Sequence, residues 1–119
     1  MTGIRDRVAI VGMGCSKFGE RWDSSAADLM IEAVNEAYTD SGLSSQDINA
    51  AWVGTASSFR TGQPVAEALK FNYIPITRVE NACATATEAF RNAAYAVAAG
   101  IYDIVLAVGV EKLKDSGFS

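Results

Sequence analysis

Cys83 is the residue of this sequence that is best placed for chemistry. It follows a β-branched segment that begins near residue 74, and it precedes a long alanine-rich segment with helical spacing. The thiol is therefore predicted to lie at a strand-to-helix turn, at or near the helix N-terminus. Unpaired N–H groups and the positive end of the helix dipole favour a thiolate at such a place. This position suits a cysteine nucleophile; the alternative interpretation is a small buried side chain that only begins a helix.

The chain contains no histidine, and this absence limits the chemistry that it can perform. A Ser-His or Cys-His pair cannot form within these 119 residues, and most zinc sites are excluded as well, so no metal is predicted. The second cysteine, Cys15, lies in a loop beside two glycines and lacks the helix N-terminus of Cys83. It is therefore interpreted as a bystander thiol.

Composition and charge exclude several classes of protein. Half of the residues are apolar and 20% are charged, which is ordinary for a soluble globular protein. The net charge of −4 and the lack of a Lys/Arg cluster argue against a nucleic-acid surface. Two cysteines are too few for a disulfide scaffold and nothing resembles a signal peptide, so reduced thiols in a cytoplasmic setting are expected. Residues 93–110 are almost all apolar, but Gly100 and Asp103 interrupt them, which indicates a buried helix and strand rather than a membrane span.

Apolar runs that alternate with helical spacing predict the order β-α-β-α-β-α-β and an α/β fold with a mostly parallel, layered sheet. Ser24 or Ser25 is predicted to cap the first helix at its N-terminus, and Gly42 at its C-terminus. The last helix carries mostly alanine, which predicts a helix buried centrally between two layers. The predicted strands are residues 7–14, 51–56, 76–81 and 103–110, and the predicted helices are residues 26–39, 65–70 and 83–99.

Two glycines after the first predicted strand require a separate interpretation. Gly12 and Gly14 resemble the beginning of a dinucleotide-binding fingerprint, but the third glycine of that motif would fall at Lys17. The next predicted helix also begins too late, near residue 26. A purely structural turn is therefore favoured.

The residues around Cys83 resemble the nucleophile segment of the thiolase superfamily. Residues 80–86 (Glu-Asn-Ala-Cys-Ala-Thr-Ala) are similar to that segment in the sterol-carrier-protein-like and acetyl-CoA acetyltransferase branch. Residues 8–19 look like the opening strand and loop of the family. Residues 100–112, which end in a Gly-x-Glu-Lys motif, look like its next strand and exit. The resemblance covers nearly the whole chain, and it implies that residues 1–119 are a partial thiolase-like N-terminal domain.

This resemblance implies an acyl-CoA C-acyltransferase of lipid metabolism, with coenzyme A and acyl-CoA as substrates and no permanently bound cofactor. Cys83 would form an acyl-enzyme and pass the acyl group to coenzyme A or to the carbanion of a second acyl-CoA. The sequence departs from the family at Ala86, where the family usually has glycine. The second half of the family, which carries the activating histidine, a second cysteine and much of the coenzyme A site, is absent from these residues.

Two further functions stay open. One is a thiolase-like aldolase that acts on a side-chain acyl-CoA beside a small partner subunit. The other is a non-catalytic thiolase-like subunit for acyl-CoA binding or assembly. A second half with histidine and cysteine would favour the acyltransferase, and tyrosines in their place would favour the aldolase. The resemblance also implies a homodimer or larger assembly in which the strand at residues 76–81 pairs with its twin.

Overall fold

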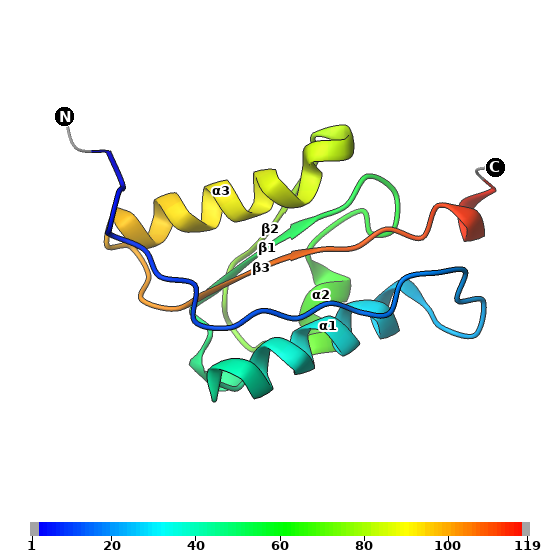
Figure 1. Cartoon of the computed structure of the whole chain (residues 1–119), viewed down its shortest axis with the longest axis horizontal. Coiled ribbons are helices and arrows are strands. Elements are labelled where there is room, and N and C mark those ends of the chain that lie inside the picture. The colour runs from blue at the N-terminus through cyan, green and yellow to red at the C-terminus, as the bar shows by residue number, and fades with distance from the viewer. Residues whose placement is uncertain (1–2, 118–119) are drawn as a thin grey trace.

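The computed structural model describes residues 3–117 as a layered α/β arrangement. The three strands run parallel in the order β2-β1-β3, so β1 lies in the middle of the sheet. Helix α3 covers one face of this sheet, and helices α1 and α2 cover the other (Figure 1). The predicted α/β class with a parallel sheet is confirmed. The elements are α1 (Ala26–Ser41), β1 (Ala50–Gly54), α2 (Gln63–Leu69), β2 (Ile76–Val79), α3 (Thr85–Ala98) and β3 (Val105–Gly109), with short 3-10 turns at Ser45–Asp47, Ala82–Ala84 and Lys114–Ser116.

Helix α1 begins and ends where the sequence predicts. The Ser25 hydroxyl accepts a hydrogen bond from the Asp28 N–H at 3.0 Å, and the Asp28 carboxylate accepts one from the Ser25 N–H at 2.9 Å. This reciprocal pair satisfies two N–H groups that the helix itself leaves unpaired. At the other end Gly42 adopts a left-handed conformation with φ 75°, and its N–H donates to the Tyr38 carbonyl. The other predicted elements, apart from the first strand, are shifted at their ends by one or two residues.

The main hydrophobic core lies between the sheet and the pair α1 and α2. Met30 and Val34, one turn apart on α1, are 1% and 2% exposed. They pack in one cluster with Val53 of the central strand and with Val65 of α2, both of which are fully buried. Burial of each such apolar side chain contributes about 2 kcal/mol before the entropy of ordering is counted. The layers therefore hold β1 in a fixed position between its two neighbours.

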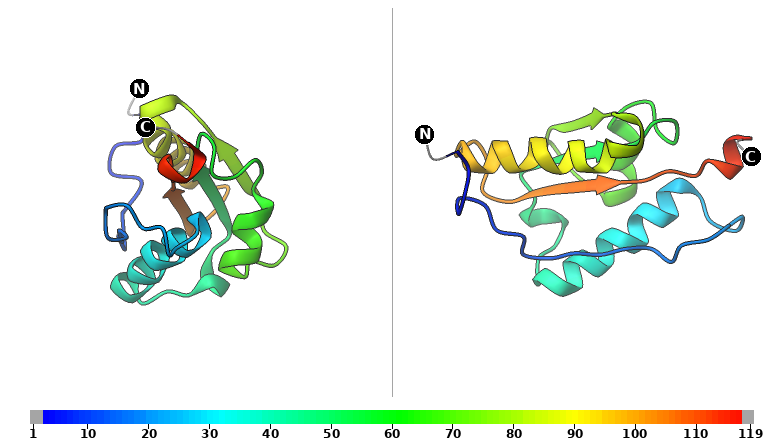
Figure 2. Two further views of the ribbon diagram at one scale, coloured as in Figure 1. Left: turned by 90° about the vertical axis from the view of Figure 1, so that its right-hand side faces the viewer. Right: turned by 45° about the horizontal axis from the view of Figure 1, so that its top comes forward.

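Helix α3 is buried on one face only. Ala89 and Ala93 are 0% and 3% exposed against the sheet, whereas Phe90 and Tyr95 are 46% and 47% exposed. The predicted burial of this alanine-rich helix is confirmed on its inner face, where five alanines and Thr85 are buried. No other described element lies over its outer face (Figure 2). The small side chains do allow the helix to approach the sheet closely on its inner face.

The first predicted strand is not formed. Residues 7–14 run extended beside α1, outside the three-stranded sheet. The Met13 N–H donates to the Asp40 carboxylate of α1 at 2.9 Å, so this backbone group pairs with a helix side chain rather than with a strand. A Cβ atom on Gly14 would lie 2.0 Å from the Ala33 carbonyl oxygen. The glycines thus allow close contact with α1, which agrees with a structural role.

A cavity of about 810 Å³ separates this extended segment from β3. Residues 8–14 and 103–110 form its long sides, and side chains of α1 and α3 line the rest of it. The apolar run at residues 8–11 therefore lines a cavity instead of pairing in the sheet. No helix within residues 3–117 combines the length and the apolar character that a bilayer crossing requires.

Candidate nucleophile site

Cys83 lies between the end of β2 and the beginning of α3, as the sequence predicts. It is the middle residue of the short 3-10 turn Ala82–Ala84, and the regular α-helix begins two residues later, at Thr85. The thiol is free and exposed. No other part of the described chain buries this residue.

Hydrogen bonds hold the turn around Cys83 in one conformation. Ala82 has φ 48°, a left-handed conformation that costs a non-glycine residue about 1 kcal/mol. The Thr85 hydroxyl offsets this cost, because it donates to the Ala82 carbonyl at 2.6 Å and accepts from the Asn81 N–H at 2.8 Å. The Ala84 N–H donates to the Asn81 carbonyl at 3.0 Å. The backbone that carries the thiol is therefore tied at both ends of the turn.

The same turn packs tightly on the ends of β1 and β3. A Cβ atom on Gly54 would lie 2.7 Å from the Thr85 carbonyl oxygen, and a Cβ atom on Gly109 would lie 2.5 Å from the Ala86 Cβ. The resemblance described above implies glycine at the position of Ala86. Here the space for the alanine methyl group comes from the strand, where Gly109 has no side chain. The departure at Ala86 therefore leaves the helix tightly packed.

The described residues place few chemical groups that could act on the Cys83 thiol. The carboxylate nearest to Cys83 in sequence, Glu80, accepts a hydrogen bond from the Ala82 N–H and so helps to hold the turn. No histidine is present, and residues 3–117 contain no group of three or more His, Cys, Asp or Glu side chains that could hold a metal ion. The described residues therefore offer the thiol neither an imidazole nor a metal ion.

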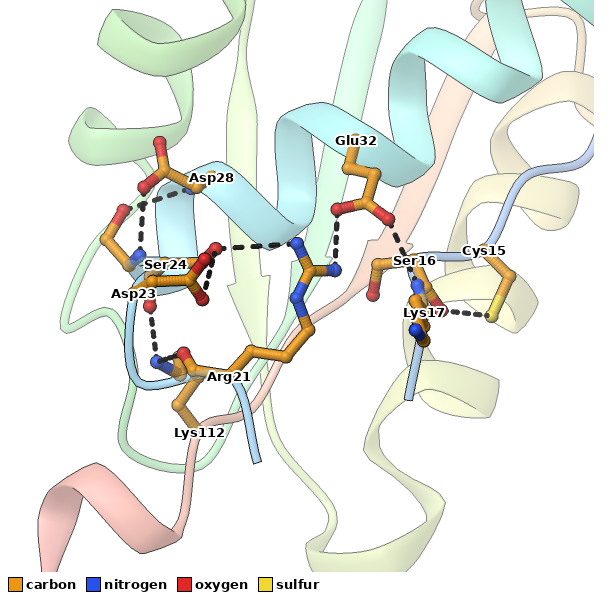
Figure 3. Close-up of polar contacts among 10 residues, drawn as sticks. Cys15, Ser16, Lys17, Arg21, Asp23, Ser24, Asp28, Glu32 and Lys112 are labelled. Atoms are coloured by element: carbon orange, nitrogen blue, oxygen red, sulfur yellow. Dashed lines mark hydrogen bonds and ion pairs between the residues drawn. The ribbon is translucent and has the colours of Figure 1, made fainter. Parts of the chain in front are cut away.

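Cys15 is a separate thiol in a different environment. It is free and exposed, and its Sγ lies 3.3 Å from the Ser16 carbonyl oxygen, to which it donates. Figure 3 shows it on the segment that α1 holds, beside the pair formed by Arg21 and Glu32. Cys15 borders the large cavity, and Cys83 does not. The structure therefore keeps the two thiols in two distinct sites.

A polar cluster at the end of β3 was not predicted from the sequence. The Glu111 carboxylate accepts hydrogen bonds from the Ala56 N–H at 2.6 Å and from the Ser57 N–H at 3.2 Å. It also accepts from the hydroxyls of Ser57, Ser58 and Thr55 at 2.9, 2.8 and 3.4 Å. Burial raises the pKa of Glu111, but these donors outweigh burial, so its pKa lies below the ordinary value. The signal was present in the Gly-x-Glu-Lys motif and in the hydroxyl residues after β1, because parallel strands bring their carboxyl ends to one edge.

Lys112, the next residue, is anchored on another loop. Its ammonium group donates to the carbonyl oxygens of Arg21 and Ser24, at 2.7 Å for Arg21, and pairs with Asp115 at 2.6 Å. Its side chain is only 9% exposed. Figure 3 shows how this lysine reaches the loop that leads into α1. The two residues of opposite charge that follow β3 therefore hold two loops: Glu111 binds residues 55–58, and Lys112 binds the loop before α1.

The fold and the thiol together define a parallel α/β protein with a cysteine at a strand-to-helix turn, an arrangement suited to covalent thiol chemistry. Residues 8–117 match the family model described as "Thiolase, N-terminal domain". The chain therefore belongs to the thiolase family, in the region of its N-terminal domain.

Curated relatives agree with this assignment. The chain is 41% identical to an acetyl-CoA acetyltransferase of Methanothermobacter thermautotrophicus and 43% identical to one of Methanocaldococcus jannaschii, each over 118 residues and 94% of this chain. It is 36% identical to sterol carrier protein 2 of Gallus gallus over 98% of its length. The chain spans only 30% of the two archaeal proteins and 23% of the chicken protein.

Solved structures give the same fold. The chain is similar to the structure named "Ltp2-ChsH2(DUF35) aldolase", with a TM-score of 0.68 and 30% identity over 79% of this chain and 25% of that one. It is also similar to 3-oxoacyl-[acyl-carrier-protein] synthase III of Aquifex aeolicus, with a TM-score of 0.74 over 89% of this chain and 45% of that one. The identity to the synthase is 18%, so this second likeness concerns the fold alone.

Proposed function

We propose that residues 1–119 form a partial thiolase-like N-terminal domain of an acyl-CoA C-acyltransferase, and that Cys83 is its nucleophile. The observation that carries this proposal is the exposed thiol of Cys83, held in a hydrogen-bonded turn at the beginning of α3. Its support comes from the family and from the acetyltransferase relatives, of which this chain spans less than a third.

The proposed reaction is a two-step acyl transfer. The Cys83 thiolate attacks the carbonyl carbon of an acyl-CoA or 3-ketoacyl-CoA. A bond forms between sulfur and the acyl carbon, and the leaving group departs with its electron pair: coenzyme A thiolate from an acyl-CoA, or the acyl-CoA carbanion from a 3-ketoacyl-CoA. In the second step coenzyme A, or the carbanion of another acyl-CoA, attacks the acyl-enzyme and releases Cys83. A base outside these residues takes the proton of the thiol.

We propose further that the native protein is a homodimer or larger assembly joined through β2. This strand is an edge of the sheet, and Thr77 on it is exposed in the isolated chain. An unpaired edge strand presents a row of N–H and C=O groups that a twin strand can satisfy. A native protein that is monomeric by light scattering would contradict this assembly.

A second candidate is a thiolase-like aldolase that acts beside a partner subunit. The observation in its favour is the likeness, at 30% identity, to the structure named "Ltp2-ChsH2(DUF35) aldolase". The residues that accompany this domain discriminate between the two functions. Histidine and a second cysteine favour acyl transfer, and tyrosines in their place favour the aldolase.

The decisive experiment replaces each thiol in the native protein, isolated with all the polypeptide that accompanies these residues. We predict that Cys83→Ala lowers acyl transfer by on the order of a thousandfold, because the acyl-enzyme cannot form. Cys15→Ala is the matched control and should retain most of the activity. Intact-mass and peptide mass spectrometry after incubation with acyl-CoA should show the acyl group on the peptide that contains Cys83, and iodoacetamide should label Cys83 first. Near-normal turnover in Cys83→Ala would favour the aldolase or a non-catalytic subunit.

A further inference from the structure

The Gly-x-Glu-Lys motif has no role in the proposed transfer, yet it forms one of the densest groups of hydrogen bonds described in the chain. Val110, between the glycine and the glutamate, extends the pairing of β3 with β1, because its N–H donates to the Gly54 carbonyl at 3.0 Å. The next side chain, Glu111, then crosses to the loop at residues 55–58 that follows β1. This loop thus has one carboxylate as its common acceptor.

The 55–58 loop is bonded in turn to the strand that leads into the Cys83 turn. The Thr55 N–H donates to the Val79 carbonyl at 3.3 Å. The Arg78 guanidinium donates to the Ala56 carbonyl at 2.9 Å. Arg78 and Val79, the donor and the acceptor on β2, lie within five residues of Cys83. Only two residues separate the end of β2 from the 3-10 turn.

The end of β1 also contacts the segment that follows the Cys83 turn. Gly54 approaches Thr85 so closely that a Cβ on the glycine would clash with the threonine carbonyl oxygen. Thr85 is the residue whose hydroxyl holds Asn81 and Ala82. A continuous series of contacts therefore joins the Glu111 carboxylate to the backbone on both sides of Cys83.

We propose that Glu111 is a positioning residue for Cys83. Its carboxylate fixes the 55–58 loop, and the loop fixes the end of β2 and the Cys83 turn. The expected effect of Glu111 on acyl transfer rests on the proposed function. The coupling between the Glu111 cluster and the Cys83 turn can be measured without that function.

The chemistry of the cluster explains why a carboxylate is required. Two backbone N–H groups and three hydroxyls converge on the two oxygens of Glu111. A carboxylate accepts through both oxygens and donates none, so it satisfies this set of donors. A glutamine of the same size would place an NH2 group among N–H donors. Glu111→Gln therefore removes acceptor capacity with little change in volume.

Hydrogen exchange of the native protein, isolated with all the polypeptide that accompanies these residues, tests the coupling directly. In Glu111→Gln the Ala56 and Ser57 amides should exchange about tenfold faster, the factor that corresponds to one lost charge-assisted hydrogen bond. The proposal requires a second effect: the Asn81 and Ala84 amides must exchange several-fold faster as well. A role confined to the loop would change only the first pair of amides, and that result would overturn the proposal.

Matched variants guard against general loosening or loss of the fold. Glu20→Gln removes another carboxylate, one that pairs with Lys114 at 3.2 Å and is 56% exposed, and it should leave all four amides unchanged. If Glu111→Gln does not fold, Arg78→Ala breaks the next contact in the series without altering Glu111. It should accelerate exchange at Asn81 and Ala84, and Arg78→Lys, which retains a donor for the Ala56 carbonyl, should do so less. No effect of Arg78→Ala at those amides would overturn the proposal.

Kinetics of the native protein separate this inference from the proposed function. Glu111→Gln should lower kcat by about tenfold and leave KM within about twofold, because it misplaces the nucleophile without removing substrate contacts. Normal kcat in Glu111→Gln together with inactive Cys83→Ala would refute the positioning role alone. Active Cys83→Ala would refute the nucleophile, and the exchange data would still decide the structural coupling.

Discussion

Residues 8–11 and β3 are both almost continuous apolar segments, and they face one another across the same cavity. The sequence predicts a buried strand at each place, but only β3 is in the sheet. The backbone of β3 meets β1, whereas the segment that contains residues 8–14 is bonded to acidic side chains of α1. The comparison shows that an apolar run predicts burial, and that the neighbouring backbone decides whether a strand forms.

The largest test of this comparison is Gly14→Ala. A Cβ atom at this position would lie 2.0 Å from the Ala33 carbonyl oxygen and 2.7 Å from the Ala37 nitrogen, so the segment must move away from α1. We expect a loss of about 2 kcal/mol in the free energy of unfolding, measured by urea denaturation of the chain. Cys15→Ala, on the next and exposed residue, should change stability by less than about 0.5 kcal/mol. An unchanged free energy of unfolding in Gly14→Ala would mean that the segment does not pack on α1.

A smaller effect is expected from Asp40→Asn. The Asp40 carboxylate accepts from the Met13 N–H, and asparagine keeps an oxygen there but loses the charge. We expect a cost of about 1 kcal/mol and faster hydrogen exchange of the Met13 amide. Glu36→Gln, an exposed residue of the same helix, is the matched control and should leave that amide unchanged. Equal exchange rates of the Met13 amide in the two variants would contradict a role of Asp40 in holding the extended segment on α1.

Much of the fold was predictable because its signals are local. The Ser25 cap, the Gly42 cap and the spacing of Met30 and Val34 all act within a few residues of sequence. The first strand was predicted wrongly because its backbone pairs with a residue distant in sequence. The Met13 N–H donates to Asp40, which lies 27 residues further along the chain. The apolar side chains of this segment do not reveal whether its backbone pairs with a strand or with a side chain of a helix.

The candidate site divides in the same way. The position of Cys83 between strand and helix followed from residues next to it in sequence. The Glu111 cluster joins residues that are 53 to 56 positions apart, so it depended on the parallel register of β1 and β3. The left-handed conformation of Ala82 had no signal at all, because an alanine gives none for a positive φ.

The smallest expected effect concerns the pH dependence of the other anchor of this segment. Glu32 accepts from the Lys17 N–H at 3.1 Å and pairs with the Arg21 guanidinium at 2.7 Å (Figure 3). The Lys17 amide and then Arg21 hold the pKa of Glu32 below its ordinary value of 4.5. The unfolded chain therefore binds the proton more readily, so the stabilisation by Glu32 is fully present above pH 4.5 and is lost as the pH falls through the folded pKa.

Glu32→Gln should therefore flatten the acid limb of the stability curve, measured by urea denaturation at a series of pH values below 5. At pH 7 the variant should be slightly less stable than the parent chain, and the two should converge as the medium becomes more acidic. High salt should shrink the difference, because the pair is partly exposed and screened. Parallel curves for variant and parent at every pH would show that Glu32 does not hold the extended segment, and the contrast with the paired strand β3 would then rest on Asp40 and the glycines alone.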